Sequence, residues 1–563
     1  MNPTRLLAYF DRISEAPDAI PRLRRFILDL AVRGKLVEQD PKDEPASELL
    51  KQIQTERSRL VKAGEIRKER PLPLVAEDEA PYSPPTGWAW VRIRQVTSDR
   101  GQVTPDKDFT YIDVTAINKE VGCVADAKVL SPLDAPSRAR KMVRTGDVLY
   151  SCVRPYLLNI AVIEKDIIPL PIASTAFAVL NGFGLVLSKY LWIALRSPFM
   201  VECVEAKMRG QAYPAINDSD FAVLPLPLPP LAEQHRIVAK VDELMALCDR
   251  LEAAMAEREN RRDRLTAASL DRLNNGVDAK SVREHARFHL RHLPCLTTRP
   301  EHIQQLRQTI LNLAMRGKLV PQDPKDEPAS ELLKRIAKEK ARLDLKHEVS
   351  PLVADEIPFV LQRGWSWSRI GEICSKTGSG STPRGGQAVY KSMGIPFLRS
   401  QNVYDDGLRL DDVAYIDAAT HARMGGTAVK PRDLLLNITG GSMGRCCRVP
   451  DVFGEANVSQ HVAIIRTAWP GIEDFLHRLV LSPYFQAFIF DEQTGAGRGG
   501  LPKNRMDRIA VALPPLAEQR RIVAKVDELM ALCDRLEAQL KTTQTESRRL
   551  LEATLHEALG KAA

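Results

Sequence analysis

The chain has 563 residues, of which 44% are hydrophobic and 27% charged, proportions that are ordinary for a globular protein and exclude a disordered chain. This length accommodates three or four domains, each with a full core. The net charge of +8 is compatible with an anionic partner such as nucleic acid but does not establish one. Nine cysteines without a C-x-x-C pair argue against a disulfide framework and favour a reducing cytoplasm.

Residues 1–79 predict an N-terminal helical arm. The first residues lack the apolar stretch of a signal peptide, so secretion is not expected. Leu23, Ile27 and Leu30 recur at helical spacing, the series stops at Gly34 as an expected C-cap, and helical patterning resumes from Ala46 to Leu60.

Residues 80–228 have a mixed character and are called the first variable domain. The segment opens with P-T-G-W-A-W-V-R-I, and the alternating run from Thr110 to Thr115 predicts a strand. The uncharged run from Ile167 to Ser188 contains prolines and glycines, so it predicts a buried strand and turn followed by a helix. A membrane-spanning helix is not expected there.

Residues 229–347 predict a central helical spacer. A proline pair at Pro229 and Pro230 can start a helix, and an apolar series with heptad-like spacing follows: Ile237, Val241, Leu244, Cys248, Leu251 and Met255. A helix of about 45 residues would be roughly 70 Å long. Residues 274–300 have the mixed charge and turn residues of a solvated connector, and the helical arms are expected to pack in antiparallel pairs.

Residues 348–512, the second variable domain, open with the related Q-R-G-W-S-W-S-R-I, and the run from Val458 to Ile465 predicts a strand. Residues 513–563 predict a C-terminal helical region, in which the heptad-like series returns. The expected fold therefore alternates α/β (α+β) domains with long antiparallel helical, coiled-coil regions.

Two blocks of the chain are nearly exact copies. Leu228 to Ala253 returns at Leu513 to Ala538 with one change, His235 to Arg520. Arg33 to Lys51 returns at Arg316 to Lys334 with Glu38 replaced by Pro321. A repeat period near 280 residues is far too long for a solenoid and indicates two tandem copies of a domain-sized unit, arranged as an internal pseudo-twofold repeat. The helical parts are copied, whereas the variable domains have diverged.

The motif P-P-L-A-E-Q-R-R-I-V-A-K-V-D-E-L-M resembles the helical-region signature of type I restriction-modification specificity subunits. The G-W-x-W openings, R-T-G-D-V-L from Arg144 to Leu149, K-P-R-D-L-L from Lys430 to Leu435, and F-L-R-S-Q-N-V from Phe397 to Val403 are also typical of that family. The long N-terminal arm departs from many members, which begin nearly at the first recognition domain.

The resemblance implies two target-recognition domains that each read half of a split, gapped sequence in double-stranded DNA. It also implies that the helices dock two methyltransferase subunits, which modify adenine N6 with S-adenosylmethionine, and through them endonuclease and translocase subunits that use ATP and Mg²⁺. The chain itself contains neither a phosphate-binding loop motif nor the [DN]-P-P-[YF] motif of an amino-methyltransferase. It is therefore expected to be a non-catalytic, cytoplasmic subunit with no cofactor or metal of its own.

Glycine-rich and basic stretches of the variable domains are the candidate DNA-contacting segments, because glycine lets the backbone approach phosphate while Arg, Lys, Asn and Gln donate to base edges. Ordinary surface turns are the competing interpretation. The candidates in the first variable domain are Arg154, Lys207, Arg209, Gln211, Tyr213 and Asn217. Those in the second are Arg399, Gln401, Asn402, Thr439, Arg445, Arg498, Lys503 and Asn504.

The polar face of the copied helices is the candidate partner-binding surface, since the apolar series beside it is expected to form an intramolecular core. This face is expected to be exposed, and its two copies would hold two equal partners. The residues are Glu233, Arg236, Lys240 and Glu243, repeated as Glu518, Arg521, Lys525 and Glu528.

Other functions are weaker interpretations of the sequence. The connector histidines lack the spacing of a closed zinc site, and the adjacent Cys446 and Cys447 are expected to be core thiols. Asp106 with Asp126 and Lys128 superficially resembles a nuclease set, but such spacing arises by chance in a highly charged chain. The main alternative is a structural adaptor whose two variable domains bind protein or another ligand.

Overall fold

The computed structural model describes residues 16, 18–68, 70–211, 213–276, 278–345, 349–491 and 500–561. The chain divides into two compact units, Met1–Glu257 with Thr543–Ala563, and Arg258–Thr542. Each unit combines helices with antiparallel and parallel strand pairs, so the expected mixed helix and sheet content is confirmed. The two long helices are α8 (Leu231–Asn275) and α18 (Leu516–Lys561), and each begins directly after its proline pair.

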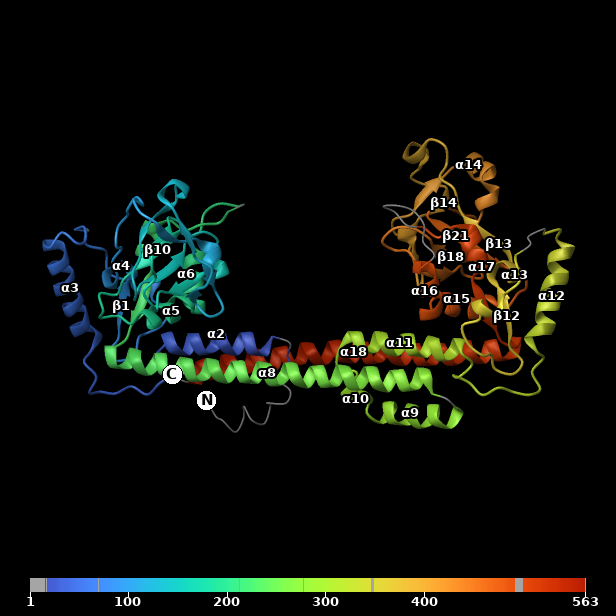
Figure 1. Ribbon diagram of the computed structural model, residues 1–563, viewed down its shortest axis with the longest axis horizontal. Helices are drawn as coiled ribbons and strands as arrows, with labels where there is room; N and C mark the ends of the chain where they lie inside the picture. The colour runs from blue at the N-terminus through green and yellow to red at the C-terminus, as the bar shows by residue number, and fades with distance from the viewer. Residues whose placement is uncertain are drawn as a thin grey trace. The chain divides into compact units, whose positions relative to one another are not determined.

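In the first unit, α2 (Ala19–Val32) lies along the first part of α8 (Figure 1). Arg24 donates to Asp249 at 2.7 Å and to Glu252 at 2.6 Å. The Nζ of Lys35 donates to the carbonyl of Leu559 at 2.8 Å, which ties the end of α2 to the last turn of α18. Gly34 ends α2 with φ +64, and the Lys35 amide bonds to the Leu30 carbonyl at 2.9 Å, which confirms the expected C-cap.

In the second unit, α11 (Pro300–Met315) is tied to the first part of α18 and to the end of α8. Arg307 donates to Asp534 at 2.6 Å and to Glu537 at 2.8 Å. Lys318, just beyond α11, donates to the carbonyl of Gly276 at 2.9 Å. These contacts have the same pattern as those of α2, and Gly317 repeats the φ of +64.

The other two arm helices, α3 (Ala46–Lys62) and α12 (Ala329–Arg342), pack on the variable domains (Figure 1). Arg57 of α3 donates to the Thr97 carbonyl at 2.8 Å, and Lys340 of α12 donates to the Gly371 carbonyl at 2.6 Å. The expectation that all arms pair with helices is therefore wrong for these two. The segment Q-D-P-K-D-E-P, at Gln39 to Pro45 and again at Gln322 to Pro328, redirects the chain before each of these helices. In α3 a short apolar face with Leu49 and Ile53 joins the core of the domain.

The first variable domain begins and ends on one antiparallel pair, β1 (Ala89–Arg92) with β11 (Pro225–Leu228). Between them lie a three-stranded sheet of order β10-β7-β8, a four-stranded sheet of order β5-β2-β9-β6, and the hairpin β3-β4. The pair β2 and β9 is parallel. The strands are β2 (Phe109–Ile112), β3 (Ile117–Asn118), β4 (Cys123–Val124), β5 (Lys128–Leu130), β6 (Ala139–Met142), β7 (Val148–Ser151), β8 (Ile160–Val162), β9 (Pro171–Ser174) and β10 (Phe177–Leu180).

The second variable domain has the corresponding strand pairs. Its first and last strands, β12 (Ser366–Arg369) and β22 (Ala510–Leu513), pair antiparallel, and its sheets have the orders β13-β21-β18-β19, β17-β14-β20 and β15-β16. The pair β14 and β20 is parallel. The remaining strands are β13 (Cys374–Ser379), β14 (Ile395–Leu398), β15 (Val403–Tyr404), β16 (Gly407–Leu408), β17 (Ala414–Ile416), β18 (Leu434–Asn437), β19 (Cys446–Arg448), β20 (Asn457–Val458) and β21 (Val462–Thr467).

Two strand predictions are correct only in part. The run from Thr110 to Thr115 is a strand as far as Ile112 and then turns, because Asp113 accepts the Thr115 amide at 2.9 Å. The run from Val458 to Ile465 is broken between β20 and β21. By contrast, the run from Ile167 to Ser188 forms strands β9 and β10 and leads into α5 (Ser188–Arg196), as expected.

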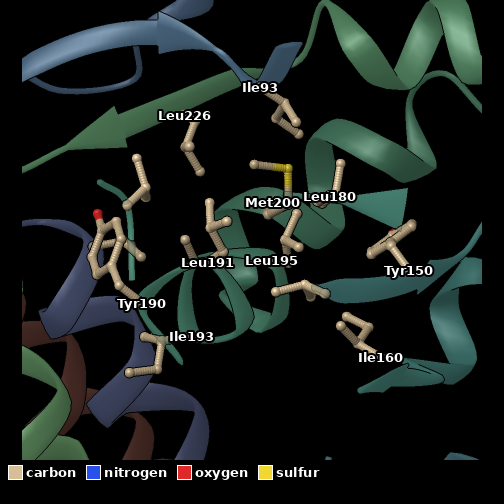
Figure 2. Close-up of a cluster of buried hydrophobic side chains, with 14 of the residues drawn as sticks. Ile93, Tyr150, Ile160, Leu180, Tyr190, Leu191, Ile193, Leu195, Met200 and Leu226 are labelled. Atoms are coloured by element: carbon tan, nitrogen blue, oxygen red, sulfur yellow. The ribbon is translucent and has the colours of Figure 1, made fainter. Parts of the chain in front are cut away.

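The core of the first variable domain lies where α5 and α6 (Pro198–Glu205) pack on its strands (Figure 2). Tyr190, Leu191 and Leu195 from α5 and Met200 from α6 are buried against strand residues such as Leu226. The corresponding core of the second domain is built on α15 (Glu473–Val480) and α16 (Pro483–Asp491). Short helices complete the two domains: α4 (Ile93–Val96), α7 (Asp218–Ala222), α13 (Ile370–Ile373), α14 (Ala418–Arg423) and α17 (Lys503–Arg508).

The connector is helical rather than a solvated linker, with α9 (Ala279–Arg291) and α10 (Leu293–Leu296). His289 is buried with its Nδ1 3.0 Å from the Ser269 hydroxyl, and His302 is buried with its Nε2 2.8 Å from Asp263. Val282 and His289 of α9 are buried in the second unit, which local composition did not reveal. Cys446 and Cys447 are buried thiols of β19, as expected.

Candidate nucleic-acid interface

The two candidate loops of the first variable domain meet. One follows β7 and contains Ser151 to Tyr156, and the other joins α6 to α7 and contains Lys207 to Asn217. The amide of Ile216 donates to the Cys152 carbonyl at 3.0 Å, and the amide of Arg154 donates to the Pro214 carbonyl at 2.8 Å. Sequence reasoning placed candidates on both loops, and the fold brings them together as one surface.

Arg154 occupies the left-handed region with φ 48 and ψ 55, and its guanidinium lies over the ring of Tyr213 at 4.8 Å. Tyr213 is 70% exposed. Arg209 is instead paired with Asp220 at 3.0 Å, and Asn217 caps α7 by accepting the Asp220 amide at 2.7 Å. Two further candidates on this surface are exposed: Lys207 and Gln211.

The second variable domain joins its loops in the same way. The loop after β18 contains Thr439, and the segment before α17 contains Gly500 and Leu501; the amide of Leu501 donates to the Ile438 carbonyl at 3.0 Å. A cavity of about 320 Å³ opens at this junction, lined by Gly378, Ser379, Thr439, Gly500 and Lys503 among others.

The candidates around this cavity have different surroundings. Thr439 is bonded to Nδ1 of His461 at 2.7 Å, and Lys503 pairs with Asp507 at 2.5 Å. Asn504 is exposed on α17. Arg445 is exposed and lies over the ring of Tyr404 at 4.7 Å. Arg498 lies outside the described residues.

The F-L-R-S-Q-N-V segment adjoins these loops, because Nδ2 of Asn437 donates to the Ser400 carbonyl at 2.9 Å. Gln401 is exposed and donates to Asp412 at 2.6 Å, while Arg399 donates to the Asp412 carbonyl at 3.4 Å.

Asn402 is buried, and its amide accepts the Arg399 N–H at 2.9 Å and donates to the Arg409 carbonyl at 2.9 Å. Asn402 therefore holds the turn together, and its role as a DNA contact stays a prediction.

Each variable domain also contains a buried aspartate that supports its sheet, and this residue was not among the candidates predicted from the sequence. Asp147 accepts the Arg144 amide at 2.8 Å and pairs with Arg100 at 2.7 Å. Asp433 accepts the Lys430 amide at 2.7 Å and pairs with Arg466 at 2.7 Å. The shared motif R-T-G-D-V-L and its echo K-P-R-D-L-L carried the signal.

A buried glutamate at the start of each long helix holds the adjoining variable domain. Glu233 accepts from the indole Nε1 of Trp88 at 2.8 Å and from Gln39 at 2.6 Å. This set, Trp88 with Glu233 and Gln39, is called the first latch. In the second latch, Glu518 accepts from Trp365 at 3.1 Å and from Gln322 at 3.0 Å.

The exposure expected for Glu233 and Glu518 is wrong, since both are 1% exposed. Burial raises the pKa of each carboxyl above its ordinary value, and the two hydrogen bonds partly offset this shift. The helical pattern did not predict burial because the covering tryptophan comes from a distant segment, directly before β1 or β12.

The rest of the expected polar face reaches solvent. Arg236 pairs with Asp43 at 2.6 Å, and Arg521 pairs with Asp326 at 2.6 Å. Further along, ion pairs with partly exposed side chains join Lys240 to Glu243 and Lys525 to Glu528.

Two possible sites are not found in the described part of the chain. No helix there is long and apolar enough to cross a membrane. Nor do three or more histidine, cysteine or acidic side chains gather there as a possible metal site.

Comparisons with known proteins point to one family. A family model described as the type I restriction modification DNA specificity domain matches residues 159–258.

Two relatives that match over nearly the whole chain agree with this family model. The chain is 29% identical over 551 residues to the specificity subunit of the type I restriction enzyme EcoAI of Escherichia coli, covering 95% of this chain and 93% of the relative. It is 29% identical over 571 residues to the EcoEI specificity subunit of Escherichia coli, covering 96% of this chain and 94% of the relative.

A solved structure is also similar. A chain in a study of complex assembly and conformational transition of the type I R-M system matches with a TM-score of 0.52 and 26% identity, over 85% of this chain and 99% of that chain. The protein is thus similar over nearly its whole length to type I restriction-modification specificity subunits, in line with the sequence resemblance.

Proposed function

We propose that this chain reads a bipartite, gapped target in double-stranded DNA, with one half of the target bound by each variable domain. It would catalyse no reaction itself. Its helices would dock two adenine-N6 methyltransferase subunits, and through them endonuclease and translocase subunits, in the cytoplasm. S-adenosylmethionine, ATP and Mg²⁺ would serve those partners.

The observation that carries the proposal is the contrast between the loops and their supports. Both domains present loops at the same place, after the central strand (β7 or β18) and before the short helix (α7 or α17). The residues of these loops differ, whereas the glutamate and glutamine of the two latches lie in the copied blocks. In this arrangement the DNA sequence that is read can change, while the contacts that hold each variable domain on its long helix stay the same.

The proposed partner surface consists of Arg236, Lys240 and Glu243 with their copies Arg521, Lys525 and Glu528. These side chains are partly exposed, and the copied segments give both units the same arrangement. Two equal surfaces support docking of two equal methyltransferases. Glu233 and Glu518 are excluded because their carboxylates are buried.

The decisive experiment is co-purification of the chain with a methyltransferase, followed by mapping of methylated adenines in host DNA. A bipartite motif that depends on this chain is expected. Exchange of residues 348–512 for those of a relative should change one half of the motif only, and a change in both halves would refute independent reading. A complex that forms but yields no motif dependent on this chain would favour the adaptor function.

A further inference from the structure

Arginines stacked on aromatic rings are the starting observation. In the described part of the chain nine arginines lie over such rings, with the guanidinium carbon 4.6 to 5.9 Å from the ring centroid. Seven of these guanidinium groups also donate a hydrogen bond to a carboxylate or a backbone carbonyl: Arg33, Arg57, Arg196, Arg316, Arg335, Arg399 and Arg409. Those of Arg154 and Arg445 donate to no acceptor among the described residues.

These two arginines occupy corresponding places, one in each variable domain. Arg154 lies in the loop from β7 to β8, and Arg445 lies in the loop from β18 to β19. Their tyrosines come from different elements, since Tyr213 belongs to the loop before α7 and Tyr404 ends β15. The arrangement therefore occurs in both domains without being part of a copied block.

Each arginine is held in position by its backbone as well as by its ring. Arg154 adopts a left-handed conformation that is unfavourable for a residue with a side chain, and the Pro214 carbonyl fixes its amide. The carbonyl of Arg445 accepts the Asn437 amide at 2.8 Å, and its own amide donates to Ser442 at 3.2 Å. Rigid placement with unused donors is the arrangement expected of a binding residue.

The chemistry of the site favours a base edge over a phosphate. A phosphate contact needs charge and tolerates a flexible side chain, such as that of the exposed Lys207 nearby. A guanidinium held over a ring has less freedom to turn, and its planar fork of donors suits two acceptors that lie in one plane. In the major groove, guanine offers such a pair in O6 and N7.

We propose that Arg154 and Arg445 each read a guanine, so that each half of the DNA target contains a G·C pair contacted by one stacked arginine. Tyr213 and Tyr404 are positioning residues that fix the direction of the guanidinium donors. The inference rests on the proposed function, in which both variable domains bind DNA.

The first test maps adenine methylation in cells that make the chain together with its methyltransferase partner. The wild-type motif should contain a G·C pair in each half. Arg154→Ala should relax the sequence requirement at one G·C position in one half and leave the other half unchanged, and Arg445→Ala should do the reverse. Arg409→Ala is the matched control, because Arg409 lies over the same Tyr404 ring but is tied to Asp406 at 2.6 Å; its motif should not change.

The second test measures binding of the purified complex to duplexes in which 7-deazaguanine replaces the contacted guanine, which removes the N7 acceptor but keeps base pairing. Wild-type binding should weaken by about 5-fold or more but by less than the roughly 150-fold upper limit for a complete bidentate contact, because the O6 acceptor remains. The Arg154→Ala complex should lose no further affinity at that position. Arg154→Lys keeps the charge and should also lose guanine selectivity, so it decides the matter if the alanine variant fails to fold.

Three outcomes would overturn the inference: a half-site without G·C, no effect of 7-deazaguanine, or uniform weakening on all sequences with a reduced salt dependence, which indicates a phosphate contact. In each of these cases a bipartite wild-type motif would still support the proposed function. Absence of any bipartite motif in the wild type would instead refute the proposed function itself.

Discussion

Replacing Trp88 by phenylalanine tests whether the first latch holds the first variable domain on α8. The substitution keeps an aromatic ring in a site that is 8% exposed and removes the indole N–H that donates to Glu233 at 2.8 Å. The buried carboxylate then keeps only its bond from Gln39. Trp365→Phe makes the matched change in the second latch.

A hydrogen bond to a charged group contributes about 1.5 to 3 kcal/mol, and the lost ring atoms add roughly 1 kcal/mol of apolar burial. The free energy of unfolding of the first unit should therefore fall by about 2 to 4 kcal/mol. Amide protons of β1 and the first turns of α8 that exchange by unfolding of this unit should exchange about 30- to 900-fold faster.

The loss should also grow with pH. Burial raises the pKa of Glu233, and loss of the indole donor, which favours the ionised form, raises it further. A group whose pKa is higher in the native state than in the unfolded state contributes stability at pH values below its unfolded-state pKa. That contribution is lost as the pH rises through the native-state pKa. The variant should thus fall further behind the wild type at about pH 8 than at about pH 5.

Hydrogen exchange followed by mass spectrometry gives the test, because peptides from β1 and β12 report on the two units in one sample. In Trp88→Phe only the first-unit peptides should lose protection, and in Trp365→Phe only the second-unit peptides. A loss below about 0.5 kcal/mol, or the same loss at both pH values, would refute a buried carboxyl that depends on the indole donor.

Three further predictions concern the supports of the fold and its thiols. Gly34→Ala places a Cβ 2.3 Å from Cγ of Pro85 at a φ of +64, so it should destabilise the first unit by at least about 2 kcal/mol in urea unfolding. Gly64→Ala is the control, because Gly64 has a similar φ of +73 but open space around it, and it should cost about 1 kcal/mol. Equal losses for the two variants would contradict the clash. Burial lowers the pKa of His477 to about 4, so the second unit should lose up to about 3 kcal/mol as pH falls from about 6.5 to about 4, and His477→Gln should flatten that profile. Among the nine thiols, the exposed Cys295 should react fastest with a maleimide at neutral pH, because burial raises the pKa of thiols such as Cys374 and Cys447 to about 12. Equal labelling of all thiols in mass spectrometry would contradict this order.

Features that depend on neighbouring residues could be predicted from the sequence. The helix starts after Pro230 and Pro515 and the C-caps at Gly34 and Gly317 follow from backbone restrictions of proline and glycine. The strands and helix between Ile167 and Arg196 follow from their apolar pattern and its interruptions. Each of these signals is complete within a few residues.

Features that depend on distant segments could not be predicted. Glu233 lies on a polar helical face, and its burial depends on Trp88, which is 145 residues away in the sequence. The burial of His289 depends on α9 packing against Ser269 of α8. Asn402 matches the composition of a DNA-binding loop, yet carbonyls of Arg409 and Asp412 occupy its amide.

The candidate site was predictable at the level of loops only. Glycine and basic residues indicated the segments that the fold brings together. Which arginines keep unused donors depends on carboxylates elsewhere, such as Asp220 for Arg209 and Asp406 for Arg409. Tyr404 gave no signal in the sequence because its relation to Arg445 exists only after β15 and the β18–β19 loop have come together.

The pairing of β1 with β11 gives the first variable domain two adjacent ends. Ala89 lies opposite Leu228 in the register, and paired residues in antiparallel strands are about 4.5 to 5.5 Å apart. A short turn could therefore replace all residues between these strands without stretching the chain that connects α3 to α8. Loss or gain of an entire variable domain in one deletion or insertion would thus keep the chain continuous from α3 to α8, although it would expose the α3 and α8 side chains, such as Ile53 and Ile237, that pack in the core of that domain.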